Sequence, residues 1–230
     1  MVDFHTGTID PTLVVKCPAA ALHELRQHPL WSSARERWVF GYASLIWRPE
    51  FDAAEHRPAL VRGWHRALRM RSRVNRGTPQ QPGLVFALLP GGACRGVVYR
   101  MRPEQADLEI ERLWAREMPT GVYDPRLLSC RTPQGTVTAL AFTLSRRSES
   151  CLARLPDEEM LHILRHARGR YGSTLDYLAR TASALREQGL QDREVERLMG
   201  LARAHGLVPT PESNSAGVPV SRGAQRPSAG

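Results

Sequence analysis

Lysine is almost absent from this chain of 230 residues: Lys16 is the only one, although the formal net charge is +9. The positive charge is therefore carried by arginine, a bias that often accompanies a GC-rich coding sequence. A basic surface that binds nucleic acid is the alternative. Residues 61–77 hold the most closely spaced arginines but lack the aromatic pattern with which RNA-binding sheets stack bases. We therefore expect no nucleic-acid partner.

Long hydrophobic runs and paired cysteines are lacking as well. No stretch approaches the roughly 18 apolar residues of a membrane-spanning helix, and the N-terminus does not resemble a secretory signal. The four cysteines are widely spaced without a C-x-x-C pair, which argues against a zinc site and a disulfide framework. His162 and His166 are four residues apart but stand beside acidic residues typical of a helix surface. We expect a cytoplasmic chain with no membrane association and no metal.

The order of the expected elements indicates the fold class. Strand patterns fill the first two thirds of the chain, one amphipathic helix interrupts them, and only helices follow residue 157. This order favours an α+β domain with an antiparallel sheet or barrel. The expected elements are a helix at 19–28, strands at 38–41 and 59–74, a hairpin at 82–101 that turns at Gly91 and Gly92, a helix at 102–118, a hairpin at 126–144, and helices capped by Asp157 (to about Arg170), Ser173 and Asp192.

Glu117 conflicts with the pattern of its helix. At 100° per residue it falls near the middle of the apolar face, one turn beyond Leu113 and Trp114. Two interpretations are open. At a frayed helix end, the carboxylate escapes to solvent or pairs with an arginine. In an apolar pocket, loss of hydration would raise its pKa and let it act as a general base or acid near neutral pH.

A second unusual segment is "WVFGYASLIW" at residues 38–47. An apolar strand is interrupted by Gly41, Tyr42, Ala43 and Ser44 before apolar residues resume. A plain turn is one interpretation. The other is a loop whose backbone N–H groups are left free to bind a ligand.

Four motifs occur in order between residues 38 and 206, and the set is more specific than any one of them. They are "VFGYASLIWRPEF" (39–51), "RGTPQQPGLVFAL" (76–88) with "CRGVVYR" (94–100), "LWAREM" (113–118) and "GRYGSTLDYL" (169–178). Together they resemble the ChaC-like family of γ-glutamylcyclotransferases.

The resemblance implies a small, closed, mostly antiparallel β-barrel with flanking helices at 38–206. An N-terminal extension with a short helix would precede it at 1–37, and a disordered tail would follow at 207–230. The implied activity is that of a carbon–nitrogen lyase that cleaves glutathione to 5-oxoproline and cysteinylglycine without a cofactor. The implied catalytic proton acceptor is Glu117. The implied γ-glutamyl-binding loop is Gly41, Tyr42, Ala43, Ser44, Leu45 and Ile46.

The chain departs from the family pattern in two places. Ala43 replaces the middle glycine of "GYGSL", which would be costly only if that position needs a positive φ. Ser145 and Cys151 stand where the family has asparagine and tyrosine, which bears on the distal end of the substrate. A cyclotransferase for another γ-glutamyl amide is therefore an alternative, and a non-catalytic module that binds an anion or nucleic acid is a second one.

Four further side chains are candidates for the site. Arg48 and Arg73 would bind substrate carboxylates or form surface ion pairs. Tyr42 would line the pocket, donate a hydrogen bond or belong to the core, and Tyr123 would reach the site as the chain returns past the catalytic helix.

Overall fold

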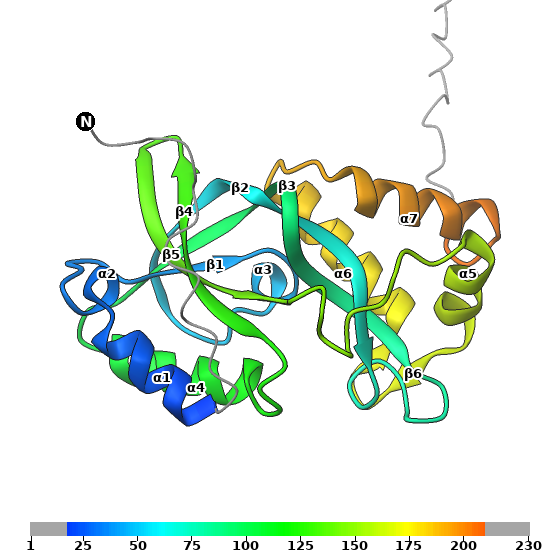
Figure 1. Ribbon diagram of the computed structural model, residues 1–230. Helices are drawn as coiled ribbons and strands as arrows, with labels where there is room; N and C mark the ends of the chain where they lie inside the picture. Colours follow the sequence, from blue (N-terminus) through cyan, green and yellow to red (C-terminus); the bar gives the residue numbers. More distant parts are fainter. Residues whose placement is uncertain (1–17, 210–230) are drawn as a thin grey trace, which may run out of the picture.

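Five strands form a closed barrel in the computed structural model, which describes residues 18–209 (Figure 1). The strand order is β1-β3-β2-β4-β5, and every neighbouring pair is antiparallel except β1 and β5. The expected α+β barrel is therefore confirmed, and the tail predicted to be disordered lies outside the described residues from 210 onward. The strands are β1 (Trp38–Gly41), β2 (Ala53–Ser72), β3 (Gly83–Met101), β4 (Asp124–Thr132) and β5 (Gly135–Thr143).

The hairpin predicted at 82–101 is wrong, because these residues form the single long strand β3. Gly91 and Gly92 do have positive φ, +100° and +76°, but the chain bends there and does not reverse. Both halves of β3 pair with the same strand, β2, whose register shifts between Arg62 and Trp64 around Gly63 (φ +80°). Paired glycines in two adjacent strands thus form a shared bend, which lets one long ribbon curve into the barrel.

The helices form two groups on opposite sides of the barrel (Figure 1). One group holds α1 (Pro18–Gln27), α2 (Pro29–Ser32) and α4 (Ala106–Glu117); the other holds α5 (Asp157–His166), α6 (Thr174–Glu187) and α7 (Arg193–Ala204). Two short strands, β6 (Arg168–Gly169) and β7 (Gly172–Ser173), lie between α5 and α6. No helix among residues 18–209 is long and apolar enough to cross a membrane.

The ends of these helices test the predicted caps. Ser173 caps α6 in a capping box with Asp176, and Asp192 caps α7 through Glu194 and Val195, as expected. The helix expected at 19–28 is α1, and Pro29 after it opens the short helix α2. The prediction for α5 was wrong at both ends. Its N-cap is Pro156, so Asp157 is the first helical residue and makes no side-chain cap, and the helix stops at His166 because the chain turns into β6.

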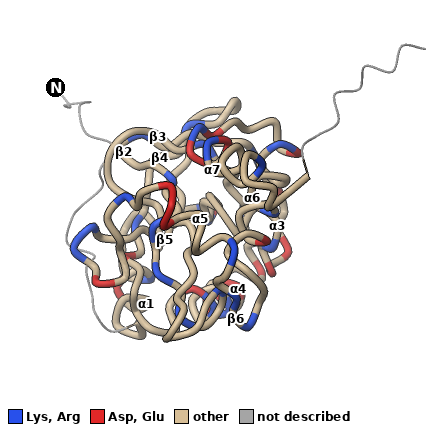
Figure 2. The backbone as a smooth tube through the Cα atoms, turned by 90° about the vertical axis from the view of Figure 1, so that its right-hand side faces the viewer, with Lys and Arg blue, Asp and Glu red and all other residues tan. Residues whose placement is uncertain are grey.

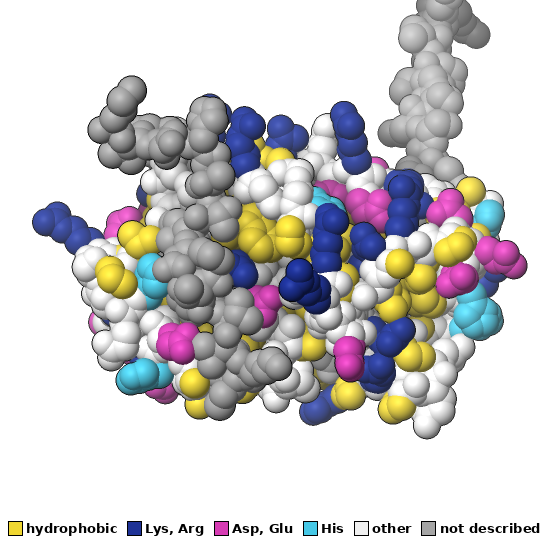
Figure 3. Space-filling view, viewed as in Figure 1, with side chains coloured by type: hydrophobic (Ala, Val, Ile, Leu, Met, Phe, Trp, Pro, Cys, Tyr) yellow, Lys and Arg dark blue, Asp and Glu magenta, His cyan; other side chains and the backbone are white. Residues whose placement is uncertain are grey.

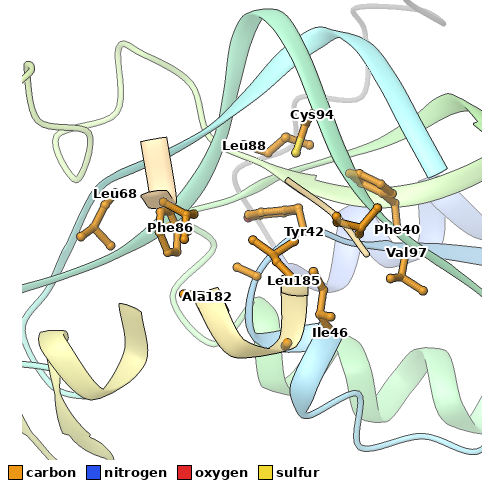
Figure 4. Packing of buried hydrophobic residues seen from close by; sticks show 14 of the residues in the cluster. Phe40, Tyr42, Ile46, Leu68, Phe86, Leu88, Cys94, Val97, Ala182 and Leu185 are labelled. Atoms are coloured by element: carbon orange, nitrogen blue, oxygen red, sulfur yellow. The ribbon is translucent and has the colours of Figure 1, made fainter. Parts of the chain in front are cut away.

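The core is divided between the two faces of the sheet. One large cluster fills the barrel and continues under α6 and α7, with Tyr42 drawn among Phe40, Phe86 and Leu185 (Figure 4). A second cluster lies between the barrel and α1, α2 and α4, where Trp31 and Trp114 are buried. The site described below sits between these two clusters.

A buried arginine joins the barrel to the C-terminal helices. Arg66, on β2, has a fully buried side chain. Its guanidinium donates to the carbonyls of Tyr42 and Arg95, both at 2.5 Å, and to the carboxylate of Asp192. One side chain therefore ties together β2, the end of β1, β3 and the cap of α7.

Replacing Asp192 by Asn should destabilise the protein by about 3–5 kcal/mol, because it removes the carboxylate that pairs with a fully buried charge. Asn is as good an N-cap as Asp, so the cap of α7 is retained and the loss reports on the ion pair alone. Chemical denaturation would measure the effect. The control is Asp157→Asn, since Asp157 is exposed where it pairs with Arg197 and should change stability little. Equal stabilities of the two variants would contradict this account.

Candidate active site

The loop between β1 and α3 (Ser44–Trp47) forms one wall of a pocket. A Cβ at Gly41 would lie 3.0 Å from the Tyr99 ring and 3.1 Å from Leu45 Cβ, so the small residue lets the chain turn closely there. Helical hydrogen bonding begins only at Ile46, whose N–H donates to the Ala43 carbonyl at 2.9 Å. Within residues 18–209, the N–H groups of Ala43, Ser44 and Leu45 donate to no acceptor.

The alanine at position 43 is compatible with this loop. Its φ is −144°, with ψ −112°, so the position does not have the positive φ at which alanine would be costly. The Tyr42 carbonyl next to it is held by Arg66, and the Tyr42 hydroxyl donates to the carbonyl of Phe142 at 2.9 Å. Tyr42 is therefore a core residue, a hydrogen-bond donor and a pocket wall at once.

Glu117 is the last residue of α4 and faces this loop from the opposite wall. Leu113 and Trp114, one turn earlier, are buried in the second core cluster and fix the face that α4 turns inward. The Glu117 side chain is only 14% exposed. Burial raises the pKa of its carboxyl above the usual range, Arg116 opposes that rise, and the negative charge of Glu50 adds to it.

The pairing of Glu117 with Arg116 is incomplete. Arg116 Nε lies 3.0 Å from Glu117 Oε1, yet that oxygen is buried without a hydrogen-bond partner among the described residues, because the two groups are poorly aligned. Of the two interpretations of Glu117, the structure agrees with a carboxylate in a pocket and not with one that escapes to solvent. Arg116 is nevertheless close to it.

Arg116 directs its hydrogen bonds instead to the segment that follows α3 and to Ser44 at the end of the loop. Its guanidinium donates to the Arg48 carbonyl at 2.5 Å, to Glu50 Oε2 at 2.9 Å and to Ser44 Oγ at 3.2 Å. Glu50 is the one non-glycine residue with positive φ (+60°) among those described, and it also accepts from Arg48. Arg116 thus fixes the distance between the loop and the end of the helix that carries Glu117.

The pocket brings most of the predicted site residues together. Gly41 and Ile46, the two ends of the predicted loop, are buried beside it and do not line it. The lining residues are Tyr42, Ala43, Ser44, Leu45, Phe86, Glu117, Tyr123, Phe142 and Tyr177.

Three of the lining residues were not predicted: Phe86, Phe142 and Tyr177. The Tyr177 hydroxyl accepts from the Phe86 N–H at 3.3 Å, and burial raises the pKa of Tyr177 and of Tyr123 above the usual range. Tyr177 belongs to the "GRYGSTLDYL" motif, which could have drawn attention to it. It is more than 130 residues from the loop in the sequence, so no local pattern predicted that the two line the same pocket.

Other candidates lie elsewhere. Arg48 forms an ion pair with Glu50, and the exposed Arg73 is not among the lining residues. Ser145 and Cys151 are also outside the lining, so the structure gives them no contact with a ligand in this pocket. Among residues 18–209, no group of three potential metal ligands occurs.

The residues of the pocket could transfer a proton and bind an anionic group of a ligand. A carboxylate with a raised pKa is a general base that works near neutral pH. The free N–H groups opposite it are donors for a carboxylate or an oxyanion. The aromatic walls exclude water, which strengthens both interactions.

Comparisons with known proteins show the family and the fold. A family model described as "ChaC-like protein" matches residues 37–205. The glutathione-specific γ-glutamylcyclotransferase of Escherichia coli K12 is 34% identical over 163 residues, covering 70% of this chain and 71% of that protein. Glutathione-specific γ-glutamylcyclotransferase 1 of Mus musculus is 32% identical over 187 residues, covering 78% and 83%. The crystal structure of a yeast γ-glutamyl cyclotransferase specific to glutathione shares the fold, with a TM-score of 0.67 at 21% identity over 74% of this chain and 96% of that one.

Replacing Glu117 by Gln should leave the melting temperature at pH 7 equal or higher. A folded-state pKa raised above the unfolded value means that ionising Glu117 at neutral pH lowers the free energy of unfolding, and Gln removes that cost. The difference should vanish as the pH falls below the ordinary pKa of Glu. Glu111→Gln, at an exposed site on the same helix, is the control and should show no gain. A Glu117→Gln variant that melts clearly below the wild type at pH 7 would contradict this assignment.

Proposed function

The chain belongs to the ChaC-like family, and on that premise we propose that it is a glutathione-specific γ-glutamylcyclotransferase. It converts glutathione to 5-oxoproline and cysteinylglycine. The observation that carries the proposal is the buried carboxylate of Glu117, which faces a loop with three free N–H groups in one pocket.

Glu117 acts as the proton acceptor in this proposal. The α-amine of the γ-glutamyl group is mostly protonated at pH 7 and cannot attack in that form. Glu117 takes one of its protons, and the amine nitrogen then attacks the γ-carbonyl carbon. Glu117 returns that proton to the cysteinyl nitrogen as the bond between the carbon and that nitrogen breaks. The new ring nitrogen loses its second proton by the same route, so 5-oxoproline leaves with a neutral lactam N–H and cysteinylglycine leaves with an ammonium group. No covalent enzyme intermediate is needed, because the substrate supplies its own nucleophile.

The loop at Ala43, Ser44 and Leu45 holds the γ-glutamyl group. Its free N–H groups bind the α-carboxylate or the oxyanion that develops on the γ-carbonyl. Holding the chain folded back on itself brings amine and carbonyl together, which supplies much of the acceleration. Arg116 sets the separation between this loop and the base, because it bonds to both walls.

We place the reaction in the cytoplasm. The described cysteines, Cys94, Cys130 and Cys151, are free thiols, which suits a reducing compartment that contains glutathione. The alternative of an anion- or nucleic-acid-binding module has less support, because basic and acidic residues are interspersed over the faces shown in Figures 2 and 3.

Glu117→Gln should lower the release of 5-oxoproline from reduced glutathione by about 10²–10⁴-fold, the usual contribution of general-base catalysis. Product release is measured by chromatography for the wild type, Glu117→Gln and the control Glu111→Gln, which should retain activity. Release that persists in Glu117→Gln would mean that the base has been assigned wrongly. If a folded wild type releases nothing from glutathione, a panel of other γ-glutamyl amides tests the alternative substrates.

The pH dependence of kcat should move in opposite directions in two variants. Activity requires ionised Glu117, so it falls as the pH drops through the raised pKa of that residue. Glu50→Gln removes a negative charge that raises the pKa, so the acidic limb should shift to lower pH. Arg116→Gln removes a positive charge that lowers the pKa, so the limb should shift to higher pH. The midpoint is read from complete pH profiles and does not depend on how far Arg116→Gln lowers the maximum rate. Shifts in the same direction would exclude Glu117 as the titrating group.

A further inference from the structure

Arg76 is a buried cation with no carboxylate partner. The residue is only 6% exposed, and it makes no ion pair with any carboxylate of residues 18–209. Its Nη1 donates to the carbonyl of Tyr171, a neutral acceptor. Burying a guanidinium without a counter-ion is costly, since hydration is lost and no opposite charge replaces it.

The neighbours of Arg76 offset this cost only in part. Its guanidinium lies 5.1 Å from the centre of the Tyr177 ring, a favourable cation–π contact. Burial nevertheless lowers the pKa of Arg76, and the positive charges of Arg180 and Arg48 lower it further, while Tyr177 and Asp176 oppose them. The Asp176 carboxylate accepts the Ser173 N–H within the cap of α6, so it is committed elsewhere.

The arginines lie at the end of an aromatic path from the pocket. Tyr177 lines the pocket together with Glu117, and the Trp47 ring centre is 6.2 Å from that of Tyr177. Arg180, which is exposed and has no ion pair among the described residues, lies 5.6 Å from the Trp47 ring centre. Arg76 and Arg180 therefore flank the Tyr177–Trp47 pair, one beneath the surface and one upon it.

We propose that Arg76 and Arg180 form a subsite for the glycyl carboxylate of glutathione, an inference that rests on the proposed function. The γ-glutamyl end of the substrate occupies the loop and Glu117, and the cysteinyl-glycine portion runs past Tyr177. A carboxylate at its far end supplies the negative charge that Arg76 lacks. Arginine suits this task because its planar fork binds a carboxylate through paired hydrogen bonds.

The test compares glutathione with its glycyl monoethyl ester, in which that carboxylate is neutral and the γ-glutamyl group is intact. The wild type should prefer glutathione by about tenfold or more in kcat/KM, mainly through KM, as expected for loss of a charge-assisted contact. Arg76→Gln and Arg180→Gln should weaken activity on glutathione, leave activity on the ester nearly unchanged, and so bring the ratio close to one. Arg165→Gln, which removes an exposed charge from α5, should keep the wild-type ratio.

Several outcomes would overturn the subsite. One is a wild type that uses both substrates equally well. A second is an unchanged ratio in folded Arg76→Gln and Arg180→Gln. A third is an equal loss on both substrates, which would mean that Arg76 is structural or holds the α-carboxylate. If Arg76→Gln does not fold, the substrate ratio of Arg180→Gln, a change at an exposed residue, tests the subsite on its own. Failure of the proposed function itself looks different, because the wild type would then release 5-oxoproline from neither substrate.

Discussion

The position of the loop depends on the buried guanidinium of Arg66. It fixes the carbonyl of Tyr42 immediately before the free N–H groups, and it binds the carboxylate that caps α7. Breaking these interactions would leave the buried charge of Arg66 without partners, which costs free energy. The loop is therefore held in one position. The C-terminal helices thereby support a pocket to whose lining α6 contributes Tyr177. The position of the loop therefore depends on contacts that join several strands of the barrel to the C-terminal helices.

A second arginine, Arg116, holds the loop at a fixed separation from Glu117. Arg116 donates to the Arg48 carbonyl after α3 and to the side chain of Ser44, yet it comes from the same helix end as Glu117. Its positive charge lowers the pKa of the Glu117 carboxyl while burial raises it. One side chain therefore influences both the position and the protonation of Glu117. The positive φ of Glu50, which is bonded to Arg116, is a local strain of the kind that clusters at functional sites.

Most of the predictions that succeeded rest on local signals, and those that needed long-range contacts failed. The caps at Ser173 and Asp192 and the misplaced Glu117 follow from patterns within one or two helical turns. The glycines at 91 and 92 are compatible with a turn or a bend, and the pairing of β3 with β2 along its whole length decides between them. Arg66 and Arg76 looked like two more members of an arginine-rich segment. Their burial depends on contacts with residues about 95 to 125 positions away, which no local pattern contains.

Among residues 18–209, Arg66, Arg76, Glu109 and Glu117 have buried or nearly buried charged side chains, and the partners of three of them indicate different roles. Arg66 has a carboxylate and two carbonyls, so its charge is satisfied within the fold and it acts as a structural tie. Glu117 has a poorly aligned arginine, and Arg76 has one carbonyl. A buried charge that is incompletely paired lowers stability, and a ligand of opposite charge can complete it. Glutathione carries an ammonium beside the scissile amide and a carboxylate at its far end. In the binding mode that we propose, the anion of Glu117 and the cation of Arg76 complement these two charges.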